Sequence, residues 1–422
     1  MSQPILGLVE SNTTGTGRMF AGAARARGLR PVLLSSRPER YPWVVEDEVD
    51  VILVDTADAG AVSTAARNCV GLVTSSEYFV AVTARAATRL GLPGGDPGAV
   101  ERCRDKRLQR AALAGAGVPV PSFAVAASPE EAVQAAAGVG FPAVVKPADG
   151  TGSRGVRLCA IADEVWRHSG ALLAQRRDER GRPTLPVVLV EEYVAGPEVS
   201  VETFGTEVVG ITAKYLGGPP WFVESGHDFP ADPSAGSGDE AVGAEAVGAV
   251  AVSALRALGL GFGAAHTEIR LGPEGPAVIE VNPRLAGGRI PTLVRLATGI
   301  DLVAAVVDAA VSGTGSALAE PGPGCAPHGW ASIRFLVPPA AGRVRRTGGV
   351  AAAAAVPGVV DVAIDARPGQ RVGGTGSFLD RVGHVISAAP TGVAARTAAE
   401  RALALLELDL DVDVDQPAVA VG

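Results

Sequence analysis

A glycine-rich stretch, "AVVKPADGTGSRGVR" at residues 143–157, limits the folds that are open to this chain. It contains Gly150-x-Gly152-x-x-Gly155, which matches the dinucleotide-binding pattern G-x-G-x-x-G. That pattern requires a helix directly after the glycines, because the helix N-terminus holds the pyrophosphate. Here the following residues, "GVRLCAI", alternate in polarity and are rich in β-branched side chains, which is typical of a strand. We therefore predict the loop of a hairpin at this position, and not a Rossmann nucleotide site.

The glycine loop still predicts phosphate binding, by a different route. Glycines allow successive backbone N–H groups to point inward as an anion-binding nest. Ser153 adds a hydroxyl group, Arg154 adds a positive charge, and Lys146 lies at the end of the preceding strand as a point charge. A mobile hairpin without chemistry is the alternative interpretation.

Residues 1–102 alternate between strand-like and helix-like patterns. The predicted strands are residues 5–10, 31–36, 49–55 and 70–76, and the predicted helices are residues 18–28 and 56–68. Strands that alternate with helices form a parallel sheet with right-handed crossovers. We therefore expect an N-terminal α/β domain.

Composition excludes several classes of protein. The net charge of -8 at pH 7 argues against a nucleic-acid binder. We expect no membrane span, because no run of about 18 apolar residues occurs, and no signal peptide, because the N-terminus lacks its pattern. The 4 cysteines are not at C-x-x-C spacing, so we expect reduced thiols and no zinc site. These features predict a cytoplasmic chain without a nucleic-acid or membrane partner.

Two further predicted strands flank a break at Gly196-Pro197. They read "VVLVEEYV" and "EVSVETF", at residues 187–194 and 198–204. Such a connection can present free backbone groups to the edge of an adenine ring. Glu198, just after the break, could accept hydrogen bonds from ribose hydroxyls, as carboxylates do in other nucleotide sites. A surface acid is the alternative.

The segment "AAHTEIRLGPEGPAVIEVNPRLAGGR", residues 264–289, predicts a metal site. If a hairpin turns at Glu274-Gly275, counting outward puts Glu268 opposite Glu280, with Cβ atoms about 5 Å apart. Asn282 lies on the same face, and two carboxylates with an amide oxygen suit Mg²⁺. Arg284 is two residues after Asn282, where its guanidinium could stabilise negative charge that develops during a reaction. A pair of solvated acids, or a register shifted by one residue, is the alternative.

These motifs, with "RDK" at Lys106, occur in an order and spacing that resembles the ATP-grasp superfamily of carboxylate–amine ligases. The resemblance covers nearly the whole chain. It implies an α/β chain (α+β overall) with an ATP-grasp fold, a Rossmann-like N-terminal α/β domain and a C-terminal α+β domain. The implied boundaries are 1–102 for the N-terminal domain, 103–194 for the small subdomain with the glycine loop, 195–330 for the large subdomain, and 331–422 for the C-terminal domain.

The resemblance also implies ATP and two Mg²⁺ ions, with Mn²⁺ as an alternative. The implied phosphate-binding residues are Lys106, Lys146, Gly150, Thr151, Gly152, Ser153 and Gly155. The implied adenine hinge is Glu191, Glu192, Tyr193 and Val194, with Glu198 at the ribose. Glu268, Glu280 and Asn282 are similar to the metal ligands of the family, and Arg284 to the arginine that stabilises the acyl-phosphate and tetrahedral states.

Within the superfamily, the chain resembles the bacterial L-amino acid ligases, which join two unprotected amino acids. Glu224 and His227, in "WFVESGHDFPA", match an E-x-x-H motif implied to hold the donor's amino group and the reaction centre. The segment from "ASIRFLVPP" to "GHVIS" is similar to the last domain of that group. The implied catalytic set is Arg284, His227 and Lys146; the implied substrate pocket adds Glu224, Gly287 and Gly288.

The implied reaction forms an amide or peptide bond from a small carboxylic acid and an amine, both expected to be amino acids, through an acyl phosphate. One alternative is another ATP-grasp ligase that uses a non-amino-acid carboxylate, as in purine-pathway or carboxylase-type enzymes. A second is a non-catalytic ATP-binding module. A homodimer is left open. We also hypothesise that Gly288 leaves space in the substrate pocket, so that Gly288→Trp would fill this space and narrow the range of substrates.

Overall fold

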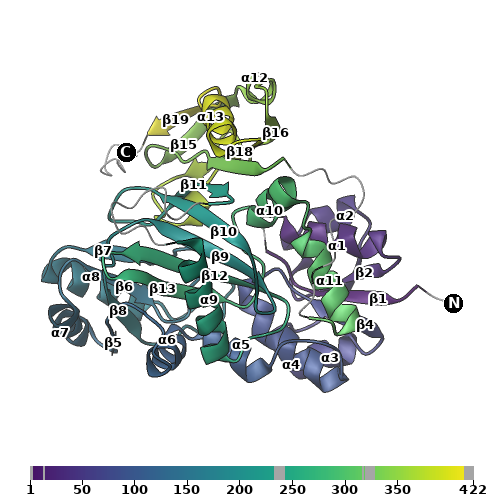
Figure 1. Cartoon of the computed structure of the whole chain (residues 1–422), viewed down its shortest axis with the longest axis horizontal. Coiled ribbons are helices and arrows are strands. Elements are labelled where there is room, and N and C mark those ends of the chain that lie inside the picture. The colour runs from purple at the N-terminus through teal and green to yellow at the C-terminus, as the bar shows by residue number, and fades with distance from the viewer. Residues whose placement is uncertain (1–2, 13–14, 232–242, 316–317, 319–327, 413–422) are drawn as a thin grey trace.

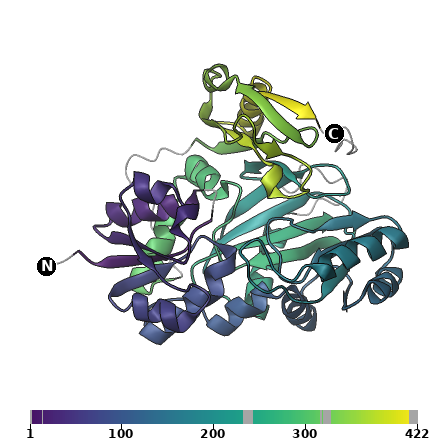
Figure 2. The same ribbon diagram turned by 180° about the vertical axis from the view of Figure 1, so that it is seen from behind.

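The computed structural model describes residues 3–12, 15–231, 243–315, 318 and 328–412. Helices and strands are both abundant, and the strands form four sheets in this part of the chain (Figure 1). Seen from behind, the N-terminal domain and the small subdomain lie on opposite sides, with the C-terminal elements above them (Figure 2). The predicted mixed α/β fold class is confirmed.

The N-terminal domain is built on a parallel sheet with the strand order β3-β2-β1-β4, as the alternating pattern predicted. Its strands are β1 (Ile5–Val9), β2 (Arg30–Ser35), β3 (Asp50–Leu53) and β4 (Cys69–Val73). Its helices are α1 (Thr16–Ala26), α2 (Trp43–Glu46), α3 (Ala59–Ala65) and α4 (Val80–Leu90), with short 3₁₀ turns at Pro38–Arg40 and Glu77–Phe79. The chain leaves β1 toward β2 and β3 and returns to β4 on the other side of β1, so the strand order reverses between β1 and β4.

The small subdomain is a four-stranded sheet with the order β5-β8-β6-β7. It contains α5 (Pro97–Arg104), α6 (Lys106–Gly115), β5 (Phe123–Ala126), α7 (Pro129–Val139), β6 (Ala143–Pro147), β7 (Arg157–Cys159), α8 (Ala162–Ala174) and β8 (Val188–Glu192). Strands β6 and β7 are antiparallel neighbours, and Val145 pairs with Arg157. The glycine loop therefore joins two hairpin strands, and the prediction of a hairpin in place of a Rossmann turn is confirmed.

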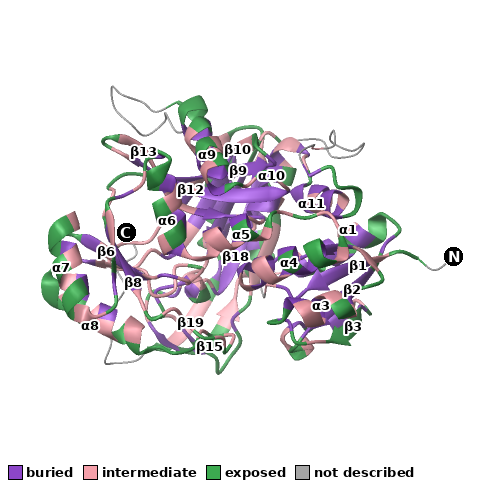
Figure 3. Cartoon of the chain, turned by 90° about the horizontal axis from the view of Figure 1, so that it is seen from below, coloured by how far each residue is buried: buried purple, intermediate pink, exposed green. Residues whose placement is uncertain are grey.

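An eight-stranded sheet with the order β13-β12-β9-β10-β11-β14-β18-β16 forms the centre of the molecule. The large subdomain supplies β9 (Glu198–Phe204), β10 (Glu207–Leu216), β11 (Glu224–Phe229), α9 (Ala244–Leu258), β12 (Ala264–Gly272), β13 (Gly275–Asn282), α10 (Ile290–Thr298) and α11 (Leu302–Ser312). Alternation of side chains gives two different faces. Val199, Val201 and Ile269 pack with Leu255 of α9 in one apolar cluster, and the opposite face carries polar side chains. Strands β9 and β12 are largely buried (Figure 3).

The C-terminal residues continue this same sheet, because β11 pairs with β14, and His227 lies opposite Ile333. They form β14 (Trp330–Phe335), β15 (Gly342–Gly348), α12 (Val350–Ala354), β16 (Val359–Ile364), β17 (Arg371–Val372), a 3₁₀ turn at Phe378–Asp380, β18 (Gly383–Ala389), α13 (Gly392–Leu403) and β19 (Glu407–Val412). Backbone hydrogen bonding thus ties the C-terminal domain rigidly to the strand that carries Glu224 and His227.

No single helix within the described ranges is long and apolar enough to cross a membrane, although the bent pair α10 and α11 passes the same test together.

Candidate active site

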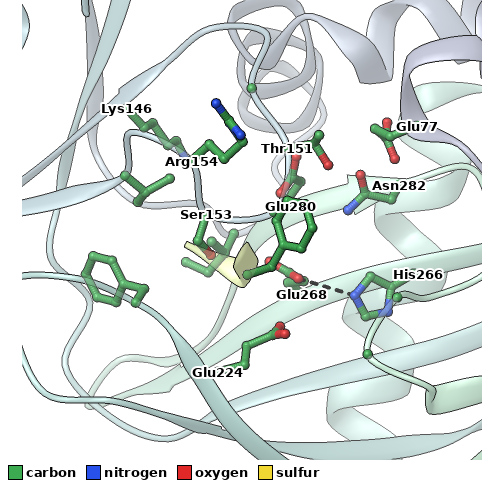
Figure 4. Close-up of a pocket in the computed structure, with 18 of the residues that line it drawn as sticks. Glu77, Lys146, Thr151, Ser153, Arg154, Glu224, His266, Glu268, Glu280 and Asn282 are labelled. Carbon is green, nitrogen blue, oxygen red and sulfur yellow. Dashed lines mark hydrogen bonds and ion pairs between the residues drawn. The ribbon is translucent and has the colours of Figure 1, made fainter. Parts of the chain in front are cut away.

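One cavity of about 580 Å³ lies where the N-terminal domain, both ATP-grasp subdomains and the C-terminal domain meet. Figure 4 shows a group of the side chains around it. Of the predicted site residues, the cavity is lined by Lys106, Lys146, Gly150, Thr151, Gly152, Ser153, Glu191, Glu192, Tyr193, Val194, Glu198, Glu224, His227, Glu268, Glu280, Asn282, Arg284, Gly287 and Gly288.

Gly155 is the exception, because it is absent from the lining of this cavity, and its place in the phosphate site stays a prediction. Its carbonyl oxygen lies 2.9 Å from Nε2 of His168, and a Cβ atom at this position would meet Leu172 at 2.7 Å. Its φ of +69° requires glycine. Gly155 therefore shapes the base of the loop and packs on α8, and it does not line the cavity.

The glycine loop is held from two sides. Asp105 caps α6 by accepting a hydrogen bond from the backbone N–H of Arg107, which fixes Lys106 in the first turn. The Nζ of Lys106 donates to the carbonyl oxygen of Gly150 at 2.5 Å. From the other side, the backbone N–H of Phe378 donates to the carbonyl oxygen of Gly152 at 3.3 Å. The C-terminal domain therefore contacts the loop directly.

Both predicted lysines face carboxylates. Nζ of Lys106 lies 2.9 Å from Glu280, and Nζ of Lys146 lies 2.5 Å from Glu191. Arg110 adds a second cation to Glu191 at 2.6 Å. Burial alone would raise the pKa of Glu191, but Arg110 and Lys146 hold it below its usual value. Burial lowers the pKa of Lys146. The side chain of Glu191 therefore pairs with Lys146. The predicted adenine hinge would use backbone groups, so this side-chain contact is a different interaction from the one predicted for Glu191.

An aromatic slot lies beside the hinge. The rings of Tyr193 and Phe222 are 6.4 Å apart and tilted by 34°, and the guanidinium of Arg270 lies over both, at 5.2 and 5.4 Å. Arg270 also donates to the carbonyl oxygen of Val194 at 3.1 Å. Flat aromatic rings that line a cavity can pack against a purine base.

The predicted carboxylate pair is present, since Glu268 lies directly opposite Glu280 on the antiparallel strands β12 and β13. Asn282 lies two residues further along β13, opposite His266. Nε2 of His266 lies 3.3 Å from Glu268, as the dashed line in Figure 4 marks, and its Nδ1 lies 3.0 Å from Glu202. No group of three or more His, Cys, Asp or Glu side chains in the described residues could hold a metal ion alone. Two carboxylates and an amide oxygen fit Mg²⁺ when substrate phosphates and water complete the shell.

Lys214 is a site residue that sequence reasoning missed. Its Nζ lies 2.7 Å from Glu198, 3.1 Å from Glu224 and 2.7 Å from Glu268. Burial would lower its pKa, but these carboxylates raise the pKa well above the usual value. The buried ammonium group of Lys214 therefore stabilises the ionised forms of Glu198, Glu224 and Glu268, although these three carboxylates lie close together. They are the acids predicted to bind the ribose, the donor amino group and the metal. The available signal was a lysine at an inward position of a strand, in "ITAKYL".

The end of the cavity around Glu224, which is the predicted substrate end, contains a buried imidazole. His227 is 1% exposed, and neither of its ring nitrogens has a hydrogen-bond partner among the described residues. Its Nε2 lies 3.7 Å from Glu224. Burial lowers the pKa of His227 to about 3, so the ring is neutral at pH 7. A buried polar group without a partner is costly, and His227 lines the cavity, where its ring nitrogens are available to hydrogen-bond a bound group.

We expect His227 to make the free protein sensitive to acid. The folded-state pKa of about 3 lies below the usual value of 6.5, so the unfolded chain binds the proton first and stability falls as pH drops below about 6.5. His227→Gln should reduce the loss of unfolding free energy between about pH 7 and about pH 5 by roughly 2 kcal/mol. Urea unfolding at both pH values measures this, and His328→Gln, which changes an exposed imidazole, is the matched control. Equal losses in wild type and His227→Gln would contradict the assignment.

Arg381 of the C-terminal domain also reaches this end, and sequence reasoning missed it. Its Nη1 lies 2.5 Å from Glu224, and its guanidinium lies 4.5 Å from the centre of the Phe335 ring. The segment that carries it is fixed by Asp380, which accepts hydrogen bonds from the backbone N–H groups of Thr375 and Gly376. The C-terminal domain therefore supplies a charged group to the predicted substrate acid.

The geometry modifies the hypothesis about Gly288. A Cβ atom at this position would lie 2.5 Å from Nε2 of His227 and 3.4 Å from Arg381, and its φ is +58°. A side chain there would point at His227, with backbone strain of about 1–2 kcal/mol.

We therefore expect Gly288→Trp to lower kcat/KM for all amino acids, and not only to narrow the range accepted. Gly288→Ala should already cost activity, and more than Gly287→Ala, because no atom lies within 4 Å of a Cβ at position 287. Steady-state kinetics across amino acids measure this. Wild-type kinetics in Gly288→Trp would show that His227 and Arg381 do not crowd the position.

Arg284 is held by an acid from the N-terminal domain. Its Nε donates to Glu77, which also pairs with Arg104 at 2.8 Å. Burial would raise the pKa of Glu77, but Arg284 and Arg104 lower it to about 2. Glu77 keeps Arg284 at the cavity wall next to Gly287 and Gly288. Nothing in the local sequence "SSEYF" marked Glu77 as a site residue.

Cys69, Cys103 and Cys159 carry free thiols, and Cys325 lies outside the described residues. Burial raises the pKa of the Cys69 and Cys159 thiols to about 11.

The amino-acid sequence matches two known protein families and several individual proteins. Residues 139–292 match the family described as ATP-grasp domain, and residues 334–411 match L-amino acid ligase C-terminal domain 2. The y4rH protein of Sinorhizobium fredii, itself uncharacterized, is 37% identical over 93% of this chain and 80% of its own length. Alanine–anticapsin ligase of Bacillus amyloliquefaciens is 28% identical over 64% of this chain and 60% of its own length.

Solved structures share the fold. L-amino acid ligase from Bacillus licheniformis superposes with a TM-score of 0.77 at 20% identity, covering 97% of this chain and 100% of that one. At that identity the likeness concerns the fold. The two family matches show that the chain belongs to the ATP-grasp ligases and carries the C-terminal domain of the L-amino acid ligases.

Proposed function

We propose that this chain joins the carboxylate of one amino acid to the amine of another, with ATP converted to ADP and phosphate. One observation carries the proposal. A single cavity is lined by the glycine loop, Lys146 and the Glu268–Glu280 pair, and also by Glu224, His227 and Arg284. A nucleotide phosphate and an amino acid can therefore meet inside it.

The first step forms an acyl phosphate. A donor carboxylate oxygen forms a bond to the γ-phosphorus of ATP, and the bond from that phosphorus to the ADP oxygen breaks. The loop N–H groups, Lys106 and Lys146 offset the charge on the transferring group. Glu268, Glu280 and Asn282 would hold one or two Mg²⁺ ions (or Mn²⁺), which supply further charge neutralisation when bound.

The second step forms the amide. The amine nitrogen forms a bond to the acyl carbon and loses a proton, and the carbon–oxygen bond to phosphate breaks. Arg284 would stabilise the oxyanion. Glu224 would hold the donor ammonium, and His227, which is neutral and unsatisfied, would accept or donate one hydrogen bond at the reaction centre. The interdomain cavity would exclude water from the acyl phosphate.

The test is ADP release with Mg²⁺ and ATP across pairwise mixtures of amino acids, each followed by mass spectrometry. We expect ADP release that requires an amino acid, and a product mass equal to two amino acids less water. ADP release with formate or bicarbonate, but not with amino acids, would favour a different ATP-grasp ligase. Nucleotide binding without ADP release under any acid would favour a binding module.

A further inference from the structure

Two arginines at the N-terminal end of the cavity lack a carboxylate partner among the described residues. These are Arg40 and Arg180, which both line the cavity. The other basic residues in its wall are all paired with acids: Lys106, Lys146, Lys214, Arg154, Arg270, Arg284 and Arg381. Arg40 and Arg180 are therefore the basic side chains of the wall that make no direct ion pair within the described part of the chain.

Arg180 is fixed in place by neutral groups. It comes from the segment between α8 and β8 and reaches the N-terminal domain, where Nη1 lies 3.0 Å from the hydroxyl of Tyr41 and Nη2 lies 3.4 Å from the carbonyl oxygen of Ser11. Its guanidinium stacks over Tyr78 at 5.7 Å. The nearby acid Glu10 is already satisfied by hydroxyl donors, among them Tyr41 at 2.8 Å. Arg180 is thus held in one orientation with N–H donors to spare.

The same end lies at the point where the parallel sheet reverses its strand order. Asn12 follows β1 and Ser75 follows β4, and the backbone N–H of Asn12 donates to the hydroxyl of Ser75 at 3.0 Å. Both line the cavity. Ligands of open α/β sheets bind at the carboxyl ends of the strands, in the crevice at this reversal. Topology and charge therefore identify the same place.

This place is next to the reaction centre. Ser75 is two residues from Glu77, so their Cα atoms are at most about 7 Å apart, and Glu77 holds Arg284. In the proposed reaction the donor has its own partners in Glu224 and His227, and its carboxylate is used at the γ-phosphate. The glycine loop and the two lysines are the partners of the ATP phosphates. The substrate left for the N-terminal end is the attacking amine.

We propose that Arg180 and Arg40, with Asn12 and Ser75, form a subsite for an anionic group on the amine substrate. For an amino acid or a short peptide this group is its free carboxylate, which a guanidinium binds in a planar, charge-assisted geometry. The enzyme would thereby select amines that carry a carboxylate over simple amines or carboxamides. The proposal rests on the ligase function proposed above and defines the class of its second substrate.

The experiment compares each accepted amino acid with its carboxamide as the amine substrate, in wild type, Arg180→Gln and Arg37→Gln. Arg37 is the matched control because it is an exposed arginine three residues before Arg40 and does not line the cavity. Wild type and Arg37→Gln should prefer the free carboxylate, and Arg180→Gln should raise KM for it by about 10- to 100-fold. The same substitution should change KM for the carboxamide much less, so the preference collapses.

Hydroxylamine, a small neutral nucleophile that needs no carboxylate site, separates the two proposals. It should trap the acyl phosphate as a hydroxamate, and Arg180→Gln should lose peptide formation much more than hydroxamate formation. Equal use of amino acid and carboxamide by wild type, or equal KM increases for both in Arg180→Gln, would overturn the subsite while leaving the ligase reaction intact. No hydroxamate with any amino acid and ATP would overturn the ligase reaction itself, and the subsite with it.

Discussion

Replacing Glu280 with alanine is expected to lower Mg²⁺-dependent ADP formation by about 10³-fold or more. Glu280 faces Glu268 across the hairpin, and a metal held by the pair would neutralise charge on the phosphoryl oxygens, an effect worth several kcal/mol. Each loss of about 1.4 kcal/mol lowers the rate tenfold. Initial rates of ADP release against Mg²⁺ concentration measure both the loss and any weaker metal affinity.

The control for this substitution lies in the same hairpin. Glu274 is exposed at its turn and does not line the cavity, so Glu274→Ala removes an acid of the same charge away from the site. Glu280→Ala also leaves Lys106 without its partner at 2.9 Å, so thermal unfolding should be recorded for both variants. ADP formation within about threefold of wild type in a folded Glu280→Ala protein would mean that the acid pair holds no essential metal.

The register of that hairpin shows how far local sequence reasoning could go. Counting outward from a turn at Glu274-Gly275 predicted Glu268 opposite Glu280. In the structure the hairpin turns one residue earlier, because Gly272 pairs with Gly275. The pairing of the two strands then shifts by one residue between Glu268 and Ile269. This irregularity restores the opposition of the two acids. The pairing was therefore predicted correctly, but the bulge that produces it has no signature in the residue pattern.

The residues that could not be predicted come from distant parts of the chain. Glu77 holds Arg284 across 207 positions, and Arg381 reaches Glu224 across 157 positions. Each belongs to a local pattern that serves another purpose, since Glu77 begins a 3₁₀ turn and Arg381 follows one. Motif spacing describes one hairpin or loop at a time. The contribution of the terminal domains to the site follows from tertiary packing, which spacing does not contain.

Arg284→Ala is expected to lower ligation by about 10²- to 10³-fold while ATP affinity stays within about threefold of wild type. Arg284 lines the cavity, and in the proposed reaction it would stabilise the charged transition state and would not bind the nucleotide. The variant should fold, because Glu77 keeps its second cation, Arg104, at 2.8 Å. Product formation by mass spectrometry and ATP titration by calorimetry give the two readouts.

Two further variants separate the charge of Arg284 from its placement. Arg289→Ala removes an arginine that does not line the cavity and should retain ligation. Glu77→Gln leaves Arg284 present but removes the acid that orients it, so it should lower kcat for ligation by less than Arg284→Ala does. If Arg284→Ala keeps normal turnover, the oxyanion is stabilised by another group, and the buried Glu77 pair would then serve only to join the N-terminal domain to the large subdomain.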